Sequence, residues 1–204
     1  MIMTAFFAVQ TIEVVAQSRR EVRQNQRDIQ QEIDRLTREG WRPTAGSLSI
    51  REQITRSRTM INEIAEDDTP KYIWGSASGT PGETLDAARL QASQVARIDL
   101  VQNIQTIILG EIETVIGNSQ LTAEEGRSVT ETVGGFGSRV DVAIGRTVTV
   151  ESMYRALPDG QRMVRMSIFW DRQQAVEAAK NAIRTDLRNR GMDILDRLNL
   201  DELR

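Results

Sequence analysis

The residue types that carry most enzyme chemistry are missing from this sequence. The chain has 204 residues and contains neither cysteine nor histidine. Their absence excludes zinc sites of the Cys/His kind, thiol nucleophiles, Ser-His-Asp triads and disulfides, and it leaves no cysteine for a lipoprotein anchor. Catalysis would have to use carboxylates, Tyr, Lys or Arg, or a metal ion held by oxygen atoms alone. The composition therefore argues against an enzyme.

Carboxylates that lie close together in the sequence do not have the spacing of a catalytic or metal-binding pair. Glu111 and Glu113 are two residues apart, and on a helix such residues point in different directions. Asp67 and Asp68 lack the alternating ligand spacing of a calcium loop and are predicted to lie in a solvated acidic turn. We therefore expect no catalytic residue, no metal ligand and no cofactor-binding residue.

The glycine-rich segment 75–82 is the nearest approach to a phosphate-binding loop. A Walker A loop needs Lys followed by Ser or Thr after its second glycine, whereas this segment continues with Thr80 and Pro81. The glycine spacing of a dinucleotide-binding fingerprint is absent as well. The segment is instead predicted to connect a short strand, residues 72–74, to the helix that follows.

Arginine and tryptophan side chains are the remaining candidates for binding. Arg162 and Arg165 are expected on the outer face of a hairpin, with Arg155 as a cross-strand neighbour. Such a face is either a plain polar surface or a patch that binds an anion or a partner's carboxylates. The three tryptophans are expected to be core anchors, with interface hot spots as the alternative. The candidate interaction surface consists of Ile29, Trp41, Arg155, Arg162 and Arg165.

The charge balance argues against nucleic acid as a partner. The chain has 29 acidic and 26 basic residues, which leaves a net charge of −3. No overall positive field would therefore draw it onto nucleic acid or an anionic membrane. Lysine occurs only at Lys71 and Lys180, and genomic base composition explains this preference for arginine at least as well as phosphate recognition does.

Residues 1–17 resemble a secretory signal segment. A short apolar run over residues 1–9 is followed, after Glu13, by Val-Val-Ala-Gln and then by polar, arginine-rich residues. The run has the length of a signal-peptide core and is far too short to span a bilayer. No lysine or arginine precedes it, which a start codon assigned too late would explain. The prediction is export, and the alternative is the first turn of a buried helix in a cytoplasmic protein.

A helix is predicted over residues 18–39, because this segment contains neither glycine nor proline until Gly40 ends it. Its apolar positions form a narrow stripe, which suits either a helix docked by one edge on a domain or a seam for self-association. A second helix follows Ser47 or Ser49, with Glu52 placed for a capping box. The apolar residues of the first helix are Val22, Ile29, Ile33 and Leu36, and those of the second are Ile50, Ile54, Ile61 and Ile64.

The strongest helical periodicity in the chain covers residues 83–117 and predicts one long helix. Ala88, Ala92 and Ala96 form a row four residues apart, and such small side chains let the helix approach a sheet or another helix closely. Residues 104–116 also alternate partly with a period of two, so a strand is the alternative there. Helix is the favoured interpretation.

From residue 140 the apolar period becomes two, which predicts an antiparallel hairpin. The first strand is expected to bulge at Gly145 and to place Val148, Val150 and Tyr154 on one side. Residues 158–160 supply turn chemistry. On the return strand the apolar side consists of Val164, Met166, Ile168 and Trp170. One further helix is predicted to begin at residue 122, and two more are predicted over residues 175–187 and 194–203.

The order of these segments resembles the small envelope domains of the Lpp-twenty lipoprotein and flagellar FlgT N-terminal type. The resemblance covers about half of the chain, from residue 72 to about 187, and rests on packing motifs. It implies a surface or periplasmic module that assembles with other envelope proteins and has no enzymatic activity. The residues that carry it are Tyr72 to Gly79, Ala88, Ala92, Ala96, Leu100, Val150 to Arg155, and Val164 to Met166.

We therefore expect an α+β fold in which an antiparallel sheet with a C-terminal hairpin packs against a long alanine-rich helix. The domains are a signal segment (1–17), a helical N-terminal region (18–70) and an α+β envelope-type domain (71–204). The expected function is that of an exported, periplasmic or outer-membrane-associated structural or interaction module. Its partners would be other envelope proteins or, through the N-terminal helix, a second copy. The alternative is a periplasmic small-ligand-binding protein or a carboxylate-based enzyme.

Overall fold

The computed structural model describes residues 23–118, 122–134 and 147–190, and it confirms the α+β class. Its strands form one antiparallel sheet in the order β1-β3-β4-β2. The strands are β1 (Arg42–Pro43), β2 (Tyr72–Gly82), β3 (Val148–Ala156) and β4 (Arg162–Asp171). The helices cover residues 23–38, here called the N-terminal helix, and α2 (Ile50–Ile61), α3 (Leu85–Asn118), α4 (Ala123–Gly134) and α6 (Arg172–Asn189).

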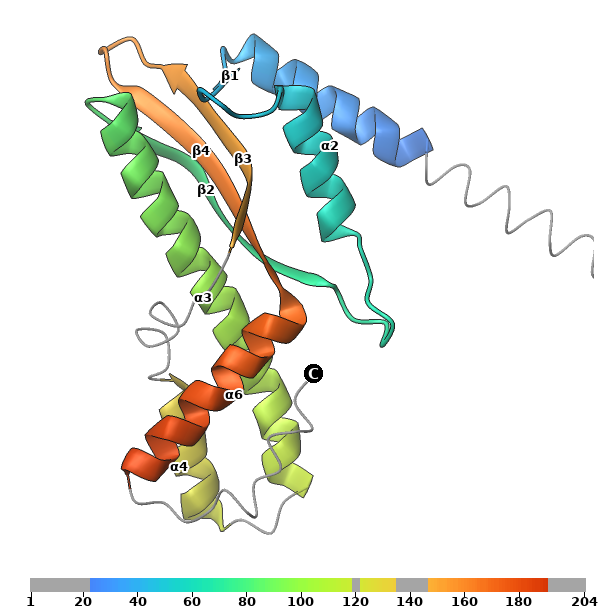
Figure 1. Cartoon of the computed structure of the whole chain (residues 1–204), viewed down its shortest axis with the longest axis vertical. Coiled ribbons are helices and arrows are strands. Elements are labelled where there is room, and N and C mark those ends of the chain that lie inside the picture. Colours follow the sequence, from blue (N-terminus) through green and yellow to red (C-terminus); the bar gives the residue numbers. More distant parts are fainter. Residues whose placement is uncertain (1–22, 119–121, 135–146, 191–204) are drawn as a thin grey trace, which may run out of the picture.

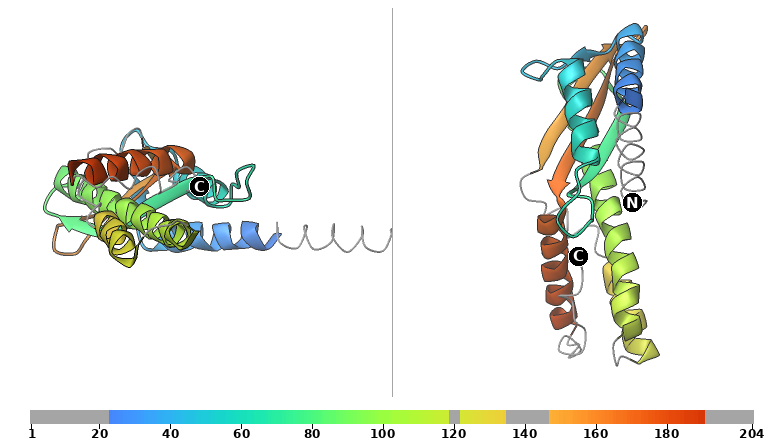
Figure 2. Two further views of the ribbon diagram at one scale, coloured as in Figure 1. Left: turned by 90° about the horizontal axis from the view of Figure 1, so that it is seen from below. Right: turned by 90° about the vertical axis from the view of Figure 1, so that its right-hand side faces the viewer.

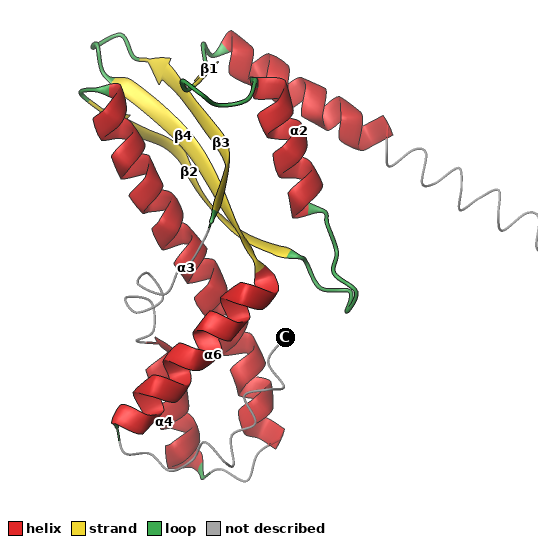
Figure 3. Cartoon of the chain, in the orientation of Figure 1, coloured by secondary structure: helices red, strands yellow, loops and turns green. Residues whose placement is uncertain are grey.

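Helices cover both faces of the sheet (Figures 1 and 3). The first half of α3 packs on one face, and the N-terminal helix and α2 pack on the other. The second half of α3 extends beyond the sheet and meets α4 and α6 there (Figure 2). This arrangement follows from β4, whose alternate residues Val164, Met166, Ile168 and Trp170 enter the core beneath α3.

The α3 face is packed closely because small residues line both sides of the contact. Ala88, Ala92 and Ala96 are completely buried, which confirms the predicted row. A Cβ atom on Gly75 of β2 would lie 2.3 Å from the carbonyl oxygen of Ala96, so only glycine fits at this position. The helix continues without a break over residues 104–116, which rules out a strand there.

The prediction that residues 75–82 form a connection is wrong, because they continue β2 to Gly82. The register with β4 shifts between Ala77 and Thr80. Glycine serves here to admit α3: a Cβ atom on Gly82 would lie 2.6 Å from the backbone nitrogen of Ala88. Gly75 and Gly82 resemble turn residues in the sequence, but they lie within β2 at the points where its backbone meets α3.

The hairpin of β3 and β4 is confirmed, but two side-chain directions within it differ from the prediction. The register of β3 on β4 shifts between Thr149 and Glu151. As a result Val150 packs with Phe169 on the α2 face, whereas Tyr154 packs on the α3 face. Arg162 is two residues before Val164 and therefore points to the same face of the sheet as Val164. Arg165 is three residues after Arg162 and points to the opposite face, so the two arginines do not share one face.

The N-terminal helix and α2 have the expected ends. Gly40 follows the N-terminal helix with φ +82°, and Ser49 forms the predicted capping box with Glu52. The apolar face of α2 differs in one residue, because Ile64 lies beyond the end of the helix and is 54% exposed. Gln53, Ser57 and Met60 supply buried positions instead, together with Ile54.

Several predicted features lie outside the described residues. They are the signal segment 1–17, Val22, the strand residues 140–144, the bulge at Gly145 and the terminal helix 194–203. Within the described part of the chain, none of the helices combines the length and the hydropathy that crossing a membrane requires.

Candidate functional site

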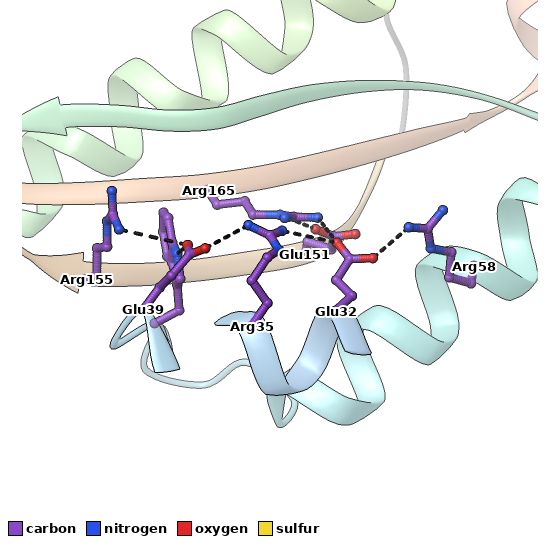
Figure 4. A network of polar contacts seen from close by, with 8 residues as sticks. Glu32, Arg35, Glu39, Arg58, Glu151, Arg155 and Arg165 are labelled. Atoms are coloured by element: carbon purple, nitrogen blue, oxygen red, sulfur yellow. Dashed lines mark hydrogen bonds and ion pairs between the residues drawn. The ribbon is translucent and has the colours of Figure 1, made fainter. Parts of the chain in front are cut away.

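Charged side chains gather between the sheet and the two helices on its α2 face, as Figure 4 shows. Arg165 of β4 lies at the centre. Its Nε donates to Glu151 of β3 and its Nη2 to Glu32 of the N-terminal helix, each over 2.9 Å. Glu32 accepts a second bond from Arg58, at the C-terminal end of α2, over 2.6 Å. We call the set Glu32, Arg35, Glu39, Arg58, Glu151, Arg155 and Arg165 the charged network.

The ion pairs of the network favour the charged forms of Glu32 and Arg165. Burial alone would raise the pKa of Glu32, but the hydrogen bonds and charges of Arg58 and Arg165 outweigh burial and lower it. Burial alone would lower the pKa of Arg165, but Glu151 and Glu32 outweigh burial and raise it. Because the Glu151 side chain is only 5% exposed, its charge depends on Arg165 for compensation.

Arg155 and Glu39 form the other end of the network, near the end of the N-terminal helix, and both contact Trp41. The Arg155 guanidinium lies 5.2 Å from the centre of the Trp41 ring, and the indole nitrogen donates to Glu39 over 3.0 Å. Trp41 is only 5% exposed and belongs to a small apolar cluster. Ile29 packs on the edge of this cluster. Its buried members are Ile33, Leu36, Trp41, Ile54 and Met153.

The predicted interaction surface is therefore mostly an internal contact between layers, which corrects its assignment to the outside of the molecule. Arg155 and Arg165 face the N-terminal helix, Trp41 is a core anchor, and Ile29 is half-buried. Arg162 stands apart at the hairpin turn, where its Nη1 donates to the Gly160 carbonyl. Of the helical stripe that suggested self-association, the described residues Ile33 and Leu36 are buried against Ile54 of α2 and Met153 of β3, and Ile29 is partly buried there.

Sequence reasoning missed the acidic partners of Arg165. Glu151 lies diagonally across the hairpin from Arg165, which is itself opposite Met153, and Glu32 is 133 residues away in sequence. Glu32 could have been noticed as a residue one position before the apolar stripe residue Ile33. The pairing of Glu32 with Arg165 depends on the tertiary structure and cannot be predicted from local sequence.

Two of the other carboxylates considered above, Glu111 and Asp67, have structural partners. Glu111 does not face Glu113 and instead forms an ion pair with Arg172 over 2.8 Å. Asp67 accepts hydrogen bonds from Thr69, which lower its pKa, as expected of a solvated turn. Among the residues that the structure describes, no group of three or more carboxylates could hold a metal ion.

The two lysines of the chain line one hollow of about 600 Å³ between residues 64–71 and the start of α6. Lys71 pairs with Glu63 over 2.5 Å, and the nearly buried Lys180 pairs with Glu177 over 3.0 Å. Hydrogen bonding to Glu63 raises the pKa of Lys71. The ion pair with Glu63 therefore favours the charged form of Lys71.

A second hollow, here called the β3 groove, has a volume of about 700 Å³. One wall is residues 45–48 with the first turns of α2, and the other is the first turns of α3. The floor is formed by β3 and by Met166 of β4. The groove is lined by Ala45, Gly46, Ser47, Leu48, Gln53, Arg56, Asp86, Arg89, Leu90, Ser93, Thr149, Val150, Ser152 and Met166.

Large apolar side chains are exposed on the outside of α3, beside the β3 groove. Leu90 is 63% exposed, Ile98 58% and Val95 44%. Gln91 and Gln94 lie between them on this side of the helix, which also carries the exposed Arg97, seven residues after Leu90. Exposed leucine, valine and isoleucine close together on one helix are typical of a contact surface.

Comparison of the chain with family models, with curated proteins and with solved structures finds no match. The charged network, the two hollows and the exposed face of α3 are therefore the features that bear on function.

Proposed function

We propose that the chain is an exported structural or protein-interaction module of a bacterial cell envelope, without catalytic activity. One observation carries this proposal. Charged side chains that could do chemistry pair with one another and hold the N-terminal helix on the sheet, whereas Leu90, Val95 and Ile98 stay exposed. Exposed apolar surface of this kind favours binding to another protein.

The envelope location is supported by two features of the sequence. Residues 1–17 have the pattern of a signal segment, and the segment from residue 72 to about 187 resembles the Lpp-twenty and FlgT N-terminal type of domain. Protein purified from the native host should begin near Gln17 or Ser18. N-terminal sequencing that finds an intact residue 1 would contradict export.

Small-ligand binding in the periplasm is the second candidate function, and the hollow that holds both lysines favours it. Lys71, Lys180 and Arg172 line the hollow together with Glu66, Asp67, Asp171 and Glu177. Such mixed charge would suit a small zwitterion. Asp171 is already used to cap α6 through the backbone nitrogen of Gln174, so a carboxylate-based reaction has weaker support than binding.

Crosslinking in intact cells tests the interaction proposal. A photo-crosslinking amino acid at Ile98 should capture other envelope proteins. The same group at Arg188, an exposed position on α6, serves as the matched control and should capture far less. Recovery of cytosolic proteins alone, or equal yields from the two positions, would reject the proposal.

A further inference from the structure

The two walls of the β3 groove carry the same pair of side chains. Residues 45–56 contribute Leu48, which is 45% exposed, and Arg56 of α2. The first turns of α3 contribute Leu90, which is 63% exposed, and Arg89. Each wall thus offers one exposed leucine and one arginine to whatever lies between them.

Both arginines of the groove are free to bind. In the described part of the chain, Arg56 and Arg89 make no hydrogen bond or ion pair, unlike the arginines of the charged network. Asp86 is the one acidic residue of the groove lining. The groove is therefore a local site of positive charge in a chain whose net charge is −3.

The floor of the groove borders an open edge of the sheet. The pairing of β1 with β3 ends at Pro43 and Met153. At the next residue of β3, Ser152, the backbone nitrogen of Thr44 and the side chain of Gln53 form hydrogen bonds with the Ser152 backbone. Within the described residues no strand pairs with this edge over Val148–Val150. Val148 is 40% exposed there.

We infer that the β3 groove binds an acidic, partly apolar segment of a partner protein. Carboxylates of the segment would pair with Arg56 and Arg89, because guanidinium groups bind carboxylates through charge-assisted hydrogen bonds. Apolar side chains of the segment would contact Leu48 and Leu90. The inference rests on the proposed interaction function and specifies the chemistry of the partner.

Two synthetic peptides supply the direct test. One is acetyl-Ser-Leu-Glu-Val-Asp-Leu-Ser-amide, and the other has Gln and Asn in place of Glu and Asp. In NMR titrations of the full chain, the acidic peptide should shift the backbone signals of Ser93, Thr149 and Ser152. The amide peptide should bind with a Kd higher by on the order of tenfold, because it loses the charge-assisted bonds.

Variants of the chain separate specific binding from general charge attraction. The double variant R56A/R89A should weaken the acidic peptide by a similar factor, and its thermal unfolding should stay near that of the wild type because both side chains are exposed. R97A, an exposed arginine two turns further along α3, is the matched control and should bind normally.

Several outcomes would overturn the inference. They are equal affinity for the two peptides, no binding at millimolar acidic peptide, and an unchanged Kd in R56A/R89A. Citrate that shifts the same signals as strongly as the peptide would show a small-anion site instead. A mass that rises with concentration in the wild type but not in R56A/R89A would show that a second copy occupies the groove.

Failure of this inference can be told apart from failure of the proposed function. If capture of envelope proteins from Ile98 persists in cells while the groove fails the peptide tests, the interaction function stands and the groove assignment falls. If Ile98 captures none of them while the acidic peptide still binds the groove, the envelope assignment falls and the groove chemistry stands.

Discussion

The two faces of the sheet are held to their helices by different forces. On the α3 face, alanines and glycines let backbones meet closely, and the core cluster is almost entirely apolar. On the other face, the apolar cluster beneath the N-terminal helix is small, and half-buried ion pairs centred on Arg165 complete the contact. The contact between α3 and the sheet depends on close packing, whereas the contact of the N-terminal helix with the sheet depends largely on ion pairs.

This difference means that the two faces should respond to different perturbations. Close contact between backbones cannot relax around an added atom, so the α3 face should be sensitive to a single methyl group. The contact on the other face should weaken whenever a carboxylate of the network is neutralised. Four substitutions test the contrast.

The largest effect is expected from Gly75→Ala. The added Cβ would lie 2.3 Å from backbone atoms of Ala96 and Leu100, so α3 would have to move off the sheet. We expect the free energy of unfolding to fall by about 3 kcal/mol, measured by urea denaturation. Gly79→Ala is the control and should cost less, because its Cβ meets only the flexible side chain of Met163. Equal losses would contradict close packing as the cause.

Arg165→Met should follow, because it leaves Glu151 buried without its main partner. Breaking a buried pair costs about 3–5 kcal/mol, and we expect about 2 kcal/mol here because Arg165 keeps some contact with solvent. Chemical denaturation would measure the loss. The double variant R165M/E151M should recover much of it. A double variant as unstable as the single one would show that Glu151 is not the source of the cost.

The third prediction concerns pH. The folded-state pKa of Glu32 is below its ordinary value of 4.5. The stability that its ionised form contributes is therefore present above about that pH and is lost as the pH falls through the lowered pKa. Glu32→Gln should destabilise the protein at pH 7 but much less at pH values below the lowered pKa. Thermal unfolding across this range measures the difference. A loss that does not change with pH would contradict the ion-pair role.

The smallest effect is a gain in stability from Gly110→Ala. Gly110 lies within α3, and a Cβ atom there would meet nothing within 4 Å. Alanine favours the helix over glycine by about 1 kcal/mol, so the midpoint of urea unfolding should rise. Set against Gly75→Ala, this opposite sign would show that the α3 face restricts side chains only where the helix meets the sheet.

The sequence predicted the α3 face better than the charged face. The row of Ala88, Ala92 and Ala96 is a local pattern, and its period alone shows that small side chains share one side of a helix. The extent of β2 was not predicted, because Gly75 and Gly82 look like turn residues until α3 is placed against them. Their role depends on a neighbour that local sequence does not reveal.

The charged face escaped prediction for a related reason. Alternation along β4 correctly separates Arg165 from the apolar residues, but it does not show that a helix covers that side. The regular pairing of the hairpin places Glu151 diagonally beside Arg165, and Glu32 reaches the same arginine from a helix 133 residues away, which local pattern does not reveal. Two distant acidic residues thus turned a predicted outer patch into an internal contact.

Gln53 has a consequence for how the sheet ends. Its side-chain amide donates to and accepts from the backbone of Ser152, so one glutamine supplies the hydrogen bonds of a missing strand. A side chain cannot pass this pairing on to a further strand, as a real strand would. Gln53 therefore occupies the hydrogen-bonding groups through which an edge strand of another molecule could pair at this position, and such pairing is the route to edge-to-edge aggregation.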